Sequence, residues 1–384
     1  MYGSVLMGYE AGHLCHSHAS IFVGETGLPP ALTDIGRLQL EATHWCQAHP
    51  DRGEQHTPVA LLWDFHTGWE APRHLYTSDT YLVWGNMPYE KGDHQIDQVL
   101  RALYPRYEDA GFYHNEHLFL TITPCGDSFD VLLSDVSADV LQRYPCVVIL
   151  GETHLEGVLL EKLTAYVAGG GNLIAWASQL GPEGERLFGV VGGECAIANH
   201  AILPDHPWPV NETPFPYRKV ALAEGAEAIV STRQGAPLVV RKGACLLCTS
   251  EYGLCNVPLK PSQIPNEVDA PLASPYALLE HVRAILLPML RSFNRVTVEG
   301  PPLQYFVNVT AQPDRLFVTL CNNSPEVWQG TIKPKRVAIR SGSNWMTGEP
   351  LSPGEEVWLK VPPLEVVVIE MLLDRPVLAP EGLA

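Results

Sequence analysis

The clearest pattern of hydrophobic and polar positions lies between residues 129 and 178. Short runs of β-branched and other apolar residues predict buried strands at 131–133, 147–150 and 173–175. Residues 155–167 have the spacing of an amphipathic helix, and the glycines at 169–171 predict where it ends. Strand–helix–strand units of this kind build a parallel sheet, and such sheets bind ligands at the carboxyl ends of their strands.

The sheet is predicted to extend on both sides of this block. A strand at 59–63 precedes it, and a loop of residues 64–93 leads from that strand to a helix at about 95–104. Further strands are expected at 228–232, 238–241 and 244–249. A helix at 276–290 closes the region, with Pro288 expected to disrupt its last turn.

From residue 296 to 373 the pattern changes to a period of two. Short strands are expected at 303–310, 315–321, 330–332, 336–339, 356–361 and 366–371, separated by turn sequences such as Asn322-Asn323-Ser324-Pro325. This predicts a small antiparallel β-sandwich. At the other end, residues 4–7 form an apolar run, and a helix capped by Thr33 or Asp34 runs to about residue 48. The predicted organisation is therefore three segments, 1–53, 57–292 and 296–373.

Composition narrows the class of protein. The chain has 384 residues, of which 46% are hydrophobic and 18% charged, as expected of a globular protein. Its formal net charge of −18 argues against a nucleic-acid partner. No apolar run is long enough to span a bilayer, so no membrane partner is expected, and residues 1–12 do not resemble a secretory signal. We expect a cytoplasmic protein, although an exported parent protein stays open.

The nine cysteines are expected to be reduced thiols, because they are scattered through apolar segments. Cys245 and Cys248 have C-x-x-C spacing, but a strand is predicted there, which would point the two side chains to opposite faces. We therefore expect neither a metal nor a redox cofactor at this pair.

The loop of residues 64–93 is the strongest candidate for a binding site. It is long, rich in aromatic residues, and leaves the carboxyl end of a predicted parallel strand. Aromatic rings stack on the apolar faces of sugars, while carboxylates, amides and arginine bind the hydroxyl groups. The alternative is a subunit or domain interface, where the same residue types are favoured. The candidate substrate-binding residues here are Asp64, His66, Trp69, Arg73, His74, Tyr76, Trp84 and Asn86.

Two weaker candidates lie near the N-terminus. Glu10 follows an apolar run, so it would lie at the carboxyl end of a barrel strand if residues 4–7 form one. His13, His16 and His18 could bind a transition metal, but no further ligand on a rigid element accompanies them. The alternative for these histidines is a polar loop at the rim of a pocket.

Several catalytic motifs are absent from the sequence. There is no G-x-S-x-G elbow and no P-loop, and no G-x-G-x-x-G follows a strand of the predicted sheet. The turn after residues 147–150 reads Gly151-Glu152-Thr153-His154, with no cysteine to act as an amidotransferase nucleophile. Glu152 and His154 are weak pocket candidates.

These segments together resemble the C-terminal part of modular glycoside hydrolases of the family 42 β-galactosidase type. The matching stretches are residues 58–62 with Trp69 nearby, 98–111, 129–132, 144–150 and 163–174, and less specifically 316–323 and 328–330. The resemblance implies a flavodoxin-like domain of the class I glutamine-amidotransferase type without its nucleophile, known in that family as the trimerisation domain. It also implies the last strand–helix unit of a (β/α)₈ barrel before that domain, and a β-sandwich after it.

The chain differs from members of that family in one respect. Family members carry an acid/base glutamate and a nucleophilic glutamate after earlier barrel strands, and glycosidic cleavage requires both. Those strands would precede Met1, so neither role passes to Glu10. We expect a non-catalytic part of a glycoside hydrolase that forms a homo-oligomer and lines a sugar pocket. The alternatives are a stand-alone sugar-binding or regulatory protein, and a metal-dependent hydrolase using His13, His16 and His18.

Overall fold

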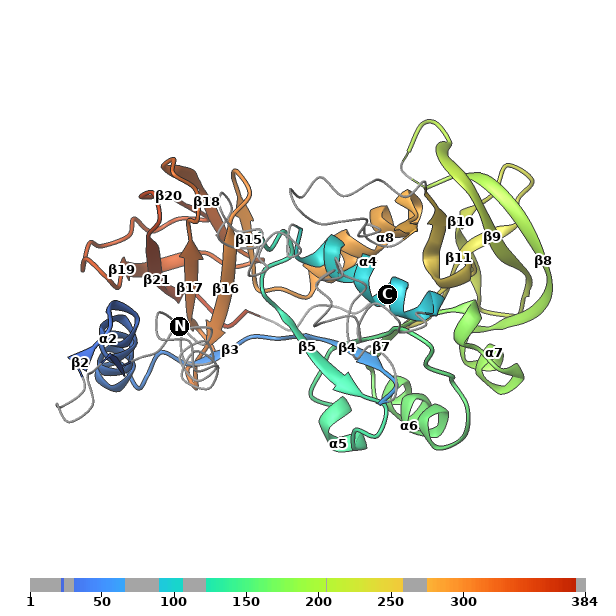
Figure 1. Ribbon diagram of the computed structural model, residues 1–384, viewed down its shortest axis with the longest axis horizontal. Helices are drawn as coiled ribbons and strands as arrows, with labels where there is room; N and C mark the ends of the chain where they lie inside the picture. The colour runs from blue at the N-terminus through green and yellow to red at the C-terminus, as the bar shows by residue number, and fades with distance from the viewer. Residues whose placement is uncertain are drawn as a thin grey trace. The chain divides into compact units, whose positions relative to one another are not determined.

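The computed structural model describes residues 22–23, 31–65, 90–105, 122–204, 206–257 and 275–377 (Figure 1). The chain divides into two compact units. The first comprises residues 1–54 and 308–312, and the second comprises residues 55–307 and 313–384.

The larger unit contains a seven-stranded sheet with the order β10-β11-β12-β7-β6-β4-β5. Its strands, in chain order, are β4 (Val59–Trp63), β5 (Phe129–Leu133), β6 (Cys146–Ile149), β7 (Asn172–Trp176), β10 (Glu227–Ser231), β11 (Pro237–Lys242) and β12 (Cys245–Cys248). β4, β5, β6, β7 and β12 are parallel, whereas β10 and β11 are antiparallel additions at one edge. The fold is therefore mixed α/β, and each strand lies within a residue or two of its predicted position.

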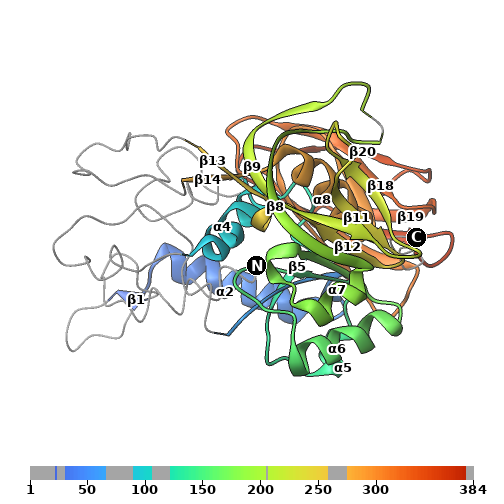
Figure 2. The same ribbon diagram turned by 90° about the vertical axis from the view of Figure 1, so that its right-hand side faces the viewer.

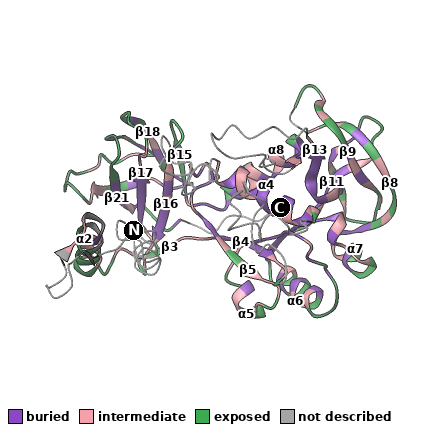
Figure 3. Ribbon diagram, in the orientation of Figure 1, coloured by how far each residue is buried: buried purple, intermediate pink, exposed green. Residues whose placement is uncertain are grey.

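Helices cover both faces of this sheet, which explains why its central strands are almost entirely apolar (Figures 1 and 2). The helices are α4 (Lys91–Leu103), α5 (Ala138–Leu141), α6 (Gly157–Ala168), α7 (Pro182–Phe188) and α8 (Glu280–Ser292). In β4, Val59 and Leu61 join the core formed with α4 and α8, whereas Ala60 and Leu62 join the core formed with α6 and α7. Figure 3 shows the burial along these elements. Cys245 and Cys248 likewise belong to the two opposite cores, so they do not face each other.

Two parts of this region differ from the sequence-based expectation. A long hairpin of β8 (Val190–Ala201) and β9 (Val210–Leu222) was not predicted, because Gly192, Pro214 and Pro216 interrupt the strand pattern. A helix was predicted at 276–290, but its first residues form the strand β14 (Tyr276–Leu278), which pairs with β13 (Leu254–Asn256). Helix α8 begins after this strand, at Glu280.

Helix α8 starts later than expected because a carboxylate from β9 caps it. Glu212 accepts hydrogen bonds from the backbone N–H groups of Glu280 at 3.1 Å and His281 at 2.9 Å. The expectation that Pro288 disrupts the last turn was wrong, since the helix continues to Ser292. Pro288 removes one backbone donor without ending the helix.

The C-terminal region is a β-sandwich around its own hydrophobic core. One sheet has the order β15-β18-β20, and the other has the order β19-β21-β17-β16-β3. The strands are β3 (Glu54–Gln55), β15 (Val296–Glu299), β16 (Gln304–Val309), β17 (Arg315–Cys321), β18 (Trp328–Pro334), β19 (Ile339–Asn344), β20 (Val357–Val361) and β21 (Val366–Leu373). The strand expected at 336–339 was misplaced, because Arg336 has a φ of 62° and lies in a turn.

In the smaller unit, β1 (Phe22–Val23) pairs with β2 (Ala31–Leu32), and α2 (Asp34–Ala48) follows. The Thr33 hydroxyl caps this helix, accepting a hydrogen bond from Gly36 N at 3.0 Å. This confirms one of the two predicted caps. The predicted strand at 4–7 lies outside the described residues, so the barrel unit stays a prediction.

Candidate functional site

The carboxyl ends of the parallel strands form the candidate site. The second parallel strand in the chain, β5, lies on one side of β4, and the third, β6, lies on the other side. A reversal of this kind creates a crevice at the carboxyl ends of the strands, where ligands of open α/β sheets bind. The residues that follow β4, β5, β6, β7 and β12 are therefore the ones to consider.

Asp64 is the predicted site residue that the structure places at this edge. It directly follows β4 and is half-buried. The Ser134 hydroxyl, which follows β5, donates a hydrogen bond to Asp64 Oδ2 at 3.0 Å. The prediction that Asp64 lies at the carboxyl end of a parallel strand is thus correct in position, and its carboxylate is oriented by the neighbouring strand.

The turn after β6 is closed by hydrogen bonds. Glu152 Oε1 accepts from Gly92 N at 2.8 Å, and Glu152 Oε2 accepts from the Tyr252 hydroxyl. A Cβ on Gly92 would lie 2.5 Å from Glu152 N, so only glycine permits this close approach of α4 to the turn. Burial, together with the hydrogen bond to Glu152, raises the pKa of the Tyr252 phenol, which therefore donates as a neutral hydroxyl.

Tyr252 has an unusual backbone conformation that its neighbours maintain. Its φ is 51°, a value that bulky residues rarely adopt, and it lies in the short 3₁₀ helix η3 (Glu251–Gly253) after β12. Its N–H donates to Ser178 Oγ at 3.2 Å, and its C=O accepts from Gln95 Nε2 at 3.0 Å. Strained residues of this kind occur at functional sites, where the surrounding contacts hold them in place.

Two buried amides, Gln95 on α4 and Gln179 after β7, hold the strand ends together. Gln95 Oε1 accepts from Gly151 N at 2.9 Å, while its Nε2 group holds Tyr252. Gln179, in the 3₁₀ helix η2 (Ala177–Gln179) after β7, donates to Gly151 O at 3.0 Å and accepts from Trp176 N at 3.0 Å. Hydrogen bonds between neutral groups therefore connect the ends of β6, β7 and β12, and Glu152 contributes a carboxylate to this network.

The predicted binding loop begins and ends at this edge. It leaves β4 at Asp64 and returns at Glu90, which caps α4 and whose N–H donates to Asp93 Oδ2 at 3.0 Å. The next residue, Lys91, forms an ion pair with Glu251 at 2.7 Å. The other predicted residues lie outside the described residues: His66, Trp69, Arg73, His74, Tyr76, Trp84 and Asn86 of the loop, and Glu10, His13, His16 and His18.

Glu152 and His154, the two other candidates from the sequence, do not form an acid–base pair with each other. Glu152 is held by Gly92 and Tyr252, whereas His154 is exposed, and no hydrogen bond between described residues joins them. Within the described part of the chain, no group of three or more His, Cys, Asp or Glu side chains is arranged to hold a metal ion. Nor does that part include a helix long and apolar enough to cross a membrane.

The structural roles of Gln95, Gln179 and Tyr252 were not predicted. Each makes hydrogen bonds to residues on other elements, and Gln95 contacts Tyr252 across 157 positions of sequence. The available signal was weak: Gln95 and Gln179 are polar residues within otherwise buried segments, and buried amides need partners.

No known family's sequence profile matches this chain, and no protein of curated function does. Among solved structures, α-L-fucosidase isoenzyme 2 from Paenibacillus thiaminolyticus is similar with a TM-score of 0.54 and 12% identity, over 89% of this chain and 52% of that one. A β-galactosidase from Bacillus circulans sp. alkalophilus has a TM-score of 0.48 and 14% identity, over 94% and 46%.

A catalytic variant of Gan42B, a GH42 β-galactosidase from G. stearothermophilus, has a TM-score of 0.49 and 12% identity, over 88% and 44% of the two chains. The chain therefore spans about half the length of these solved structures. At such low identity, the similarity to the fucosidase shows a shared fold and no shared activity.

Proposed function

We propose that this chain is the non-catalytic C-terminal part of a carbohydrate-active glycoside hydrolase, which assembles subunits and forms one wall of a sugar pocket. The fold supports this proposal. The five parallel strands have the order 2-1-3-4-5 that is typical of flavodoxin-like and amidotransferase-like domains, and a β-sandwich follows them. A similarity to about half of a fucosidase, at a TM-score of 0.54 over 89% of this chain, also supports the proposal.

The closed turn after β6 is the observation that carries the non-catalytic part of the proposal. In an amidotransferase-like domain this turn would hold a reactive thiolate. Here it holds Glu152, whose two oxygens already accept hydrogen bonds from Gly92 and Tyr252. The nearest thiol on β6 is that of Cys146, at the start of the strand, where complete burial raises its pKa and keeps it protonated.

The sugar-binding part of the proposal depends on the loop between β4 and α4. Both of its ends lie at the carboxyl edge, beside the carboxylate of Asp64 and the Lys91–Glu251 ion pair. The aromatic residues Trp69 and Trp84 lie between those ends in the sequence. A loop that begins and ends at this edge is in the right region to stack indole rings against a sugar in the crevice.

Saturation-transfer NMR with methyl β-galactoside and methyl α-L-fucoside tests this part of the proposal. We expect one of the two sugars to show transfer that falls at least about tenfold in Trp69→Ala or Trp84→Ala. The exposed Met346, on the β-sandwich, serves as the control, because Met346→Ala should leave this monosaccharide signal unchanged. Equal transfer in the wild type and both loop variants would refute the assignment.

The subunit-assembly part of the proposal is supported by exposed apolar side chains on the β8–β9 hairpin. Val191 is 62% exposed and pairs with Ala221, and Ile197 is 69% exposed and pairs with Pro216. Trp208, in the connection between the two strands, is 75% exposed. Large apolar side chains exposed along a long ribbon are typical of a segment that another subunit covers.

Light scattering coupled to size exclusion tests the assembly. We expect the wild-type chain to form an oligomer and Ile197→Glu to dissociate it, because a carboxylate would be buried in the interface without a partner. Thr331→Glu, on the β-sandwich, is the control and should leave the assembly intact. A wild-type monomer would contradict this part of the proposal.

A further inference from the structure

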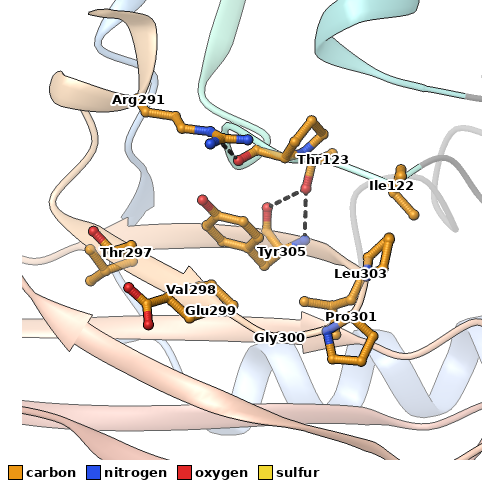
Figure 4. Close-up of a pocket in the computed structure, with 13 residues that line it drawn as sticks. Ile122, Thr123, Arg291, Thr297, Val298, Glu299, Gly300, Pro301, Leu303 and Tyr305 are labelled. Atoms are coloured by element: carbon orange, nitrogen blue, oxygen red, sulfur yellow. Dashed lines mark hydrogen bonds between the residues drawn. The ribbon is translucent and has the colours of Figure 1, made fainter. Parts of the chain in front are cut away.

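The β-sandwich has a cavity that lies away from the strand ends described above. Its volume is about 550 Å³, and it lies between residues 122–124, Arg291 and the edge strand β15 (Figure 4). Figure 4 shows Arg291 on one side of the Tyr305 ring, with Thr297 and Glu299 on the other side. Arg291 Nε donates to Pro124 O at 2.9 Å, which fixes the guanidinium at the cavity wall.

The wall of this cavity continues onto the outward face of the β15-β18-β20 sheet. Val296 and Val298 of β15 pack toward the sandwich core, so Thr297 and Glu299 point to the opposite face. The register places Glu299 opposite Thr331, and Thr331 opposite Trp358. These three side chains therefore form one row across the sheet, from the cavity to the far strand.

Trp358 is 56% exposed at the end of this row. The ammonium group of Lys360 lies 5.2 Å from the centre of its ring and helps to orient the indole. Gln329, opposite Lys360 on β18, adds an exposed amide beside the ring. The indole thus presents an aromatic face with polar side chains around it, the combination that binds both the apolar face and the hydroxyl groups of a sugar.

The polar side chains of this row have capacity for new hydrogen bonds. Within the described part of the chain, the side chains of Glu299, Gln329 and Thr331 form no hydrogen bond or ion pair with another residue. The charges on the face are mixed, with Glu299 set against Arg291 and Lys360, which disfavours a strongly anionic or cationic ligand. Hydroxyl groups of a neutral ligand can bind to all of these groups.

We propose that this surface, from Trp358 across Thr331 and Glu299 into the cavity beside Arg291, binds a neutral oligosaccharide. Neighbouring strands are about 4.8 Å apart, so Glu299 and Trp358 lie about 10 Å from each other, which leaves room for more than one sugar ring. One ring would stack on the indole, and the next would bind Glu299, Thr297 and Arg291 at the cavity. This site is distinct from the loop between β4 and α4, and its absence would leave the proposed function intact.

Isothermal titration calorimetry with cellotetraose, xylotetraose and galactan tetraose tests the proposal on the whole chain. We expect at least one tetraose to bind, and Trp358→Ala to weaken that binding about tenfold or more. Glu299→Gln should weaken it as well. Circular dichroism should show both variants folded, because both side chains are exposed.

Two control variants make the test specific. Met346→Ala removes another exposed apolar side chain, outside the row, and Glu349→Gln changes an exposed carboxylate outside the row. Neither should change tetraose affinity. The proposal is overturned if no tetraose binds, or if Met346→Ala and Trp358→Ala weaken binding equally. It is also overturned if Trp358→Ala dissociates an oligomer without any effect on saccharide binding, because the row would then be a protein interface.

Discussion

The hydrogen-bond network at the carboxyl edge predicts a large effect of replacing one buried amide. Gln95 is completely buried, and its two polar atoms hold Gly151 N and Tyr252 O at 2.9 and 3.0 Å. Gln95→Leu keeps the approximate volume of the side chain but removes the amide oxygen and nitrogen that bind these two backbone groups. The change leaves one backbone donor and one backbone acceptor buried without a hydrogen bond.

The expected cost follows from these two orphaned groups. A buried polar group without its partner costs about 1 to 3 kcal/mol, so the pair costs about 2 to 6 kcal/mol. The added apolar surface of leucine returns about 1 to 2 kcal/mol. The difference lies between about 0 and 5 kcal/mol, and we expect the free energy of unfolding to fall by about 2.5 kcal/mol, the middle of that range. The exposed Gln234 is the matched control, because Gln234→Leu in a surface turn should change stability by less than about 0.5 kcal/mol.

Urea unfolding followed by circular dichroism measures this difference, and hydrogen exchange locates it. Peptides that cover residues 146–156 should lose protection in Gln95→Leu but not in Gln234→Leu, because the Gly151 N–H is the donor that loses its acceptor. If both variants have the same midpoint and the same exchange at Gly151, Gln95 does not hold the turn closed, and the reasoning about the network is wrong.

Two further predictions concern other parts of the larger unit. Gly171→Ala should lower the free energy of unfolding by about 3 kcal/mol or more in thermal unfolding, because the new Cβ would lie 2.1 Å from the Tyr166 ring. Gly181→Ala is the control and should cost less than about 1 kcal/mol, because no atom lies within 4 Å of its new Cβ. Burial and the nearby Arg295 lower the pKa of His56 from 6.5 to about 4. As the pH drops, the unfolded chain therefore binds this proton before the folded chain does, so the free energy of unfolding should fall by at most about 3 kcal/mol between about pH 6.5 and 4. Urea titrations at several pH values should show a smaller fall in His56→Gln. An unchanged pH dependence would contradict this prediction.

The sequence predicted the central strands well, because burial on both faces leaves an uninterrupted apolar signal. β4, for example, has the predicted bounds of Val59–Trp63. The sequence failed where tertiary pairing outweighed local preference. β19 consists largely of Ser, Gly and Asn, and it forms a strand because it pairs with β21. The β8–β9 hairpin was missed because prolines and glycines mask its alternation.

The candidate site was predictable in location but not in its contacts. The position of Asp64 followed from the strand that precedes it, since the carboxyl ends of parallel strands meet at one edge. The partners of Glu152 could not be predicted, because Gly92 and Tyr252 are 60 and 100 positions away in the sequence. Similarly, only the strand register brings Glu299, Thr331 and Trp358 into one row.

Hydrolysis of chromogenic glycosides is the most direct test of the central claim that this chain is a non-catalytic part of a glycoside hydrolase. The purified chain should release no nitrophenol above background from nitrophenyl β-galactoside or nitrophenyl α-L-fucoside. Cleavage needs two positioned carboxylates, and in the described part of the candidate site the Glu152 carboxylate is already held by Gly92 and Tyr252. Turnover that co-purifies with the folded chain and disappears in Glu10→Gln would contradict the account.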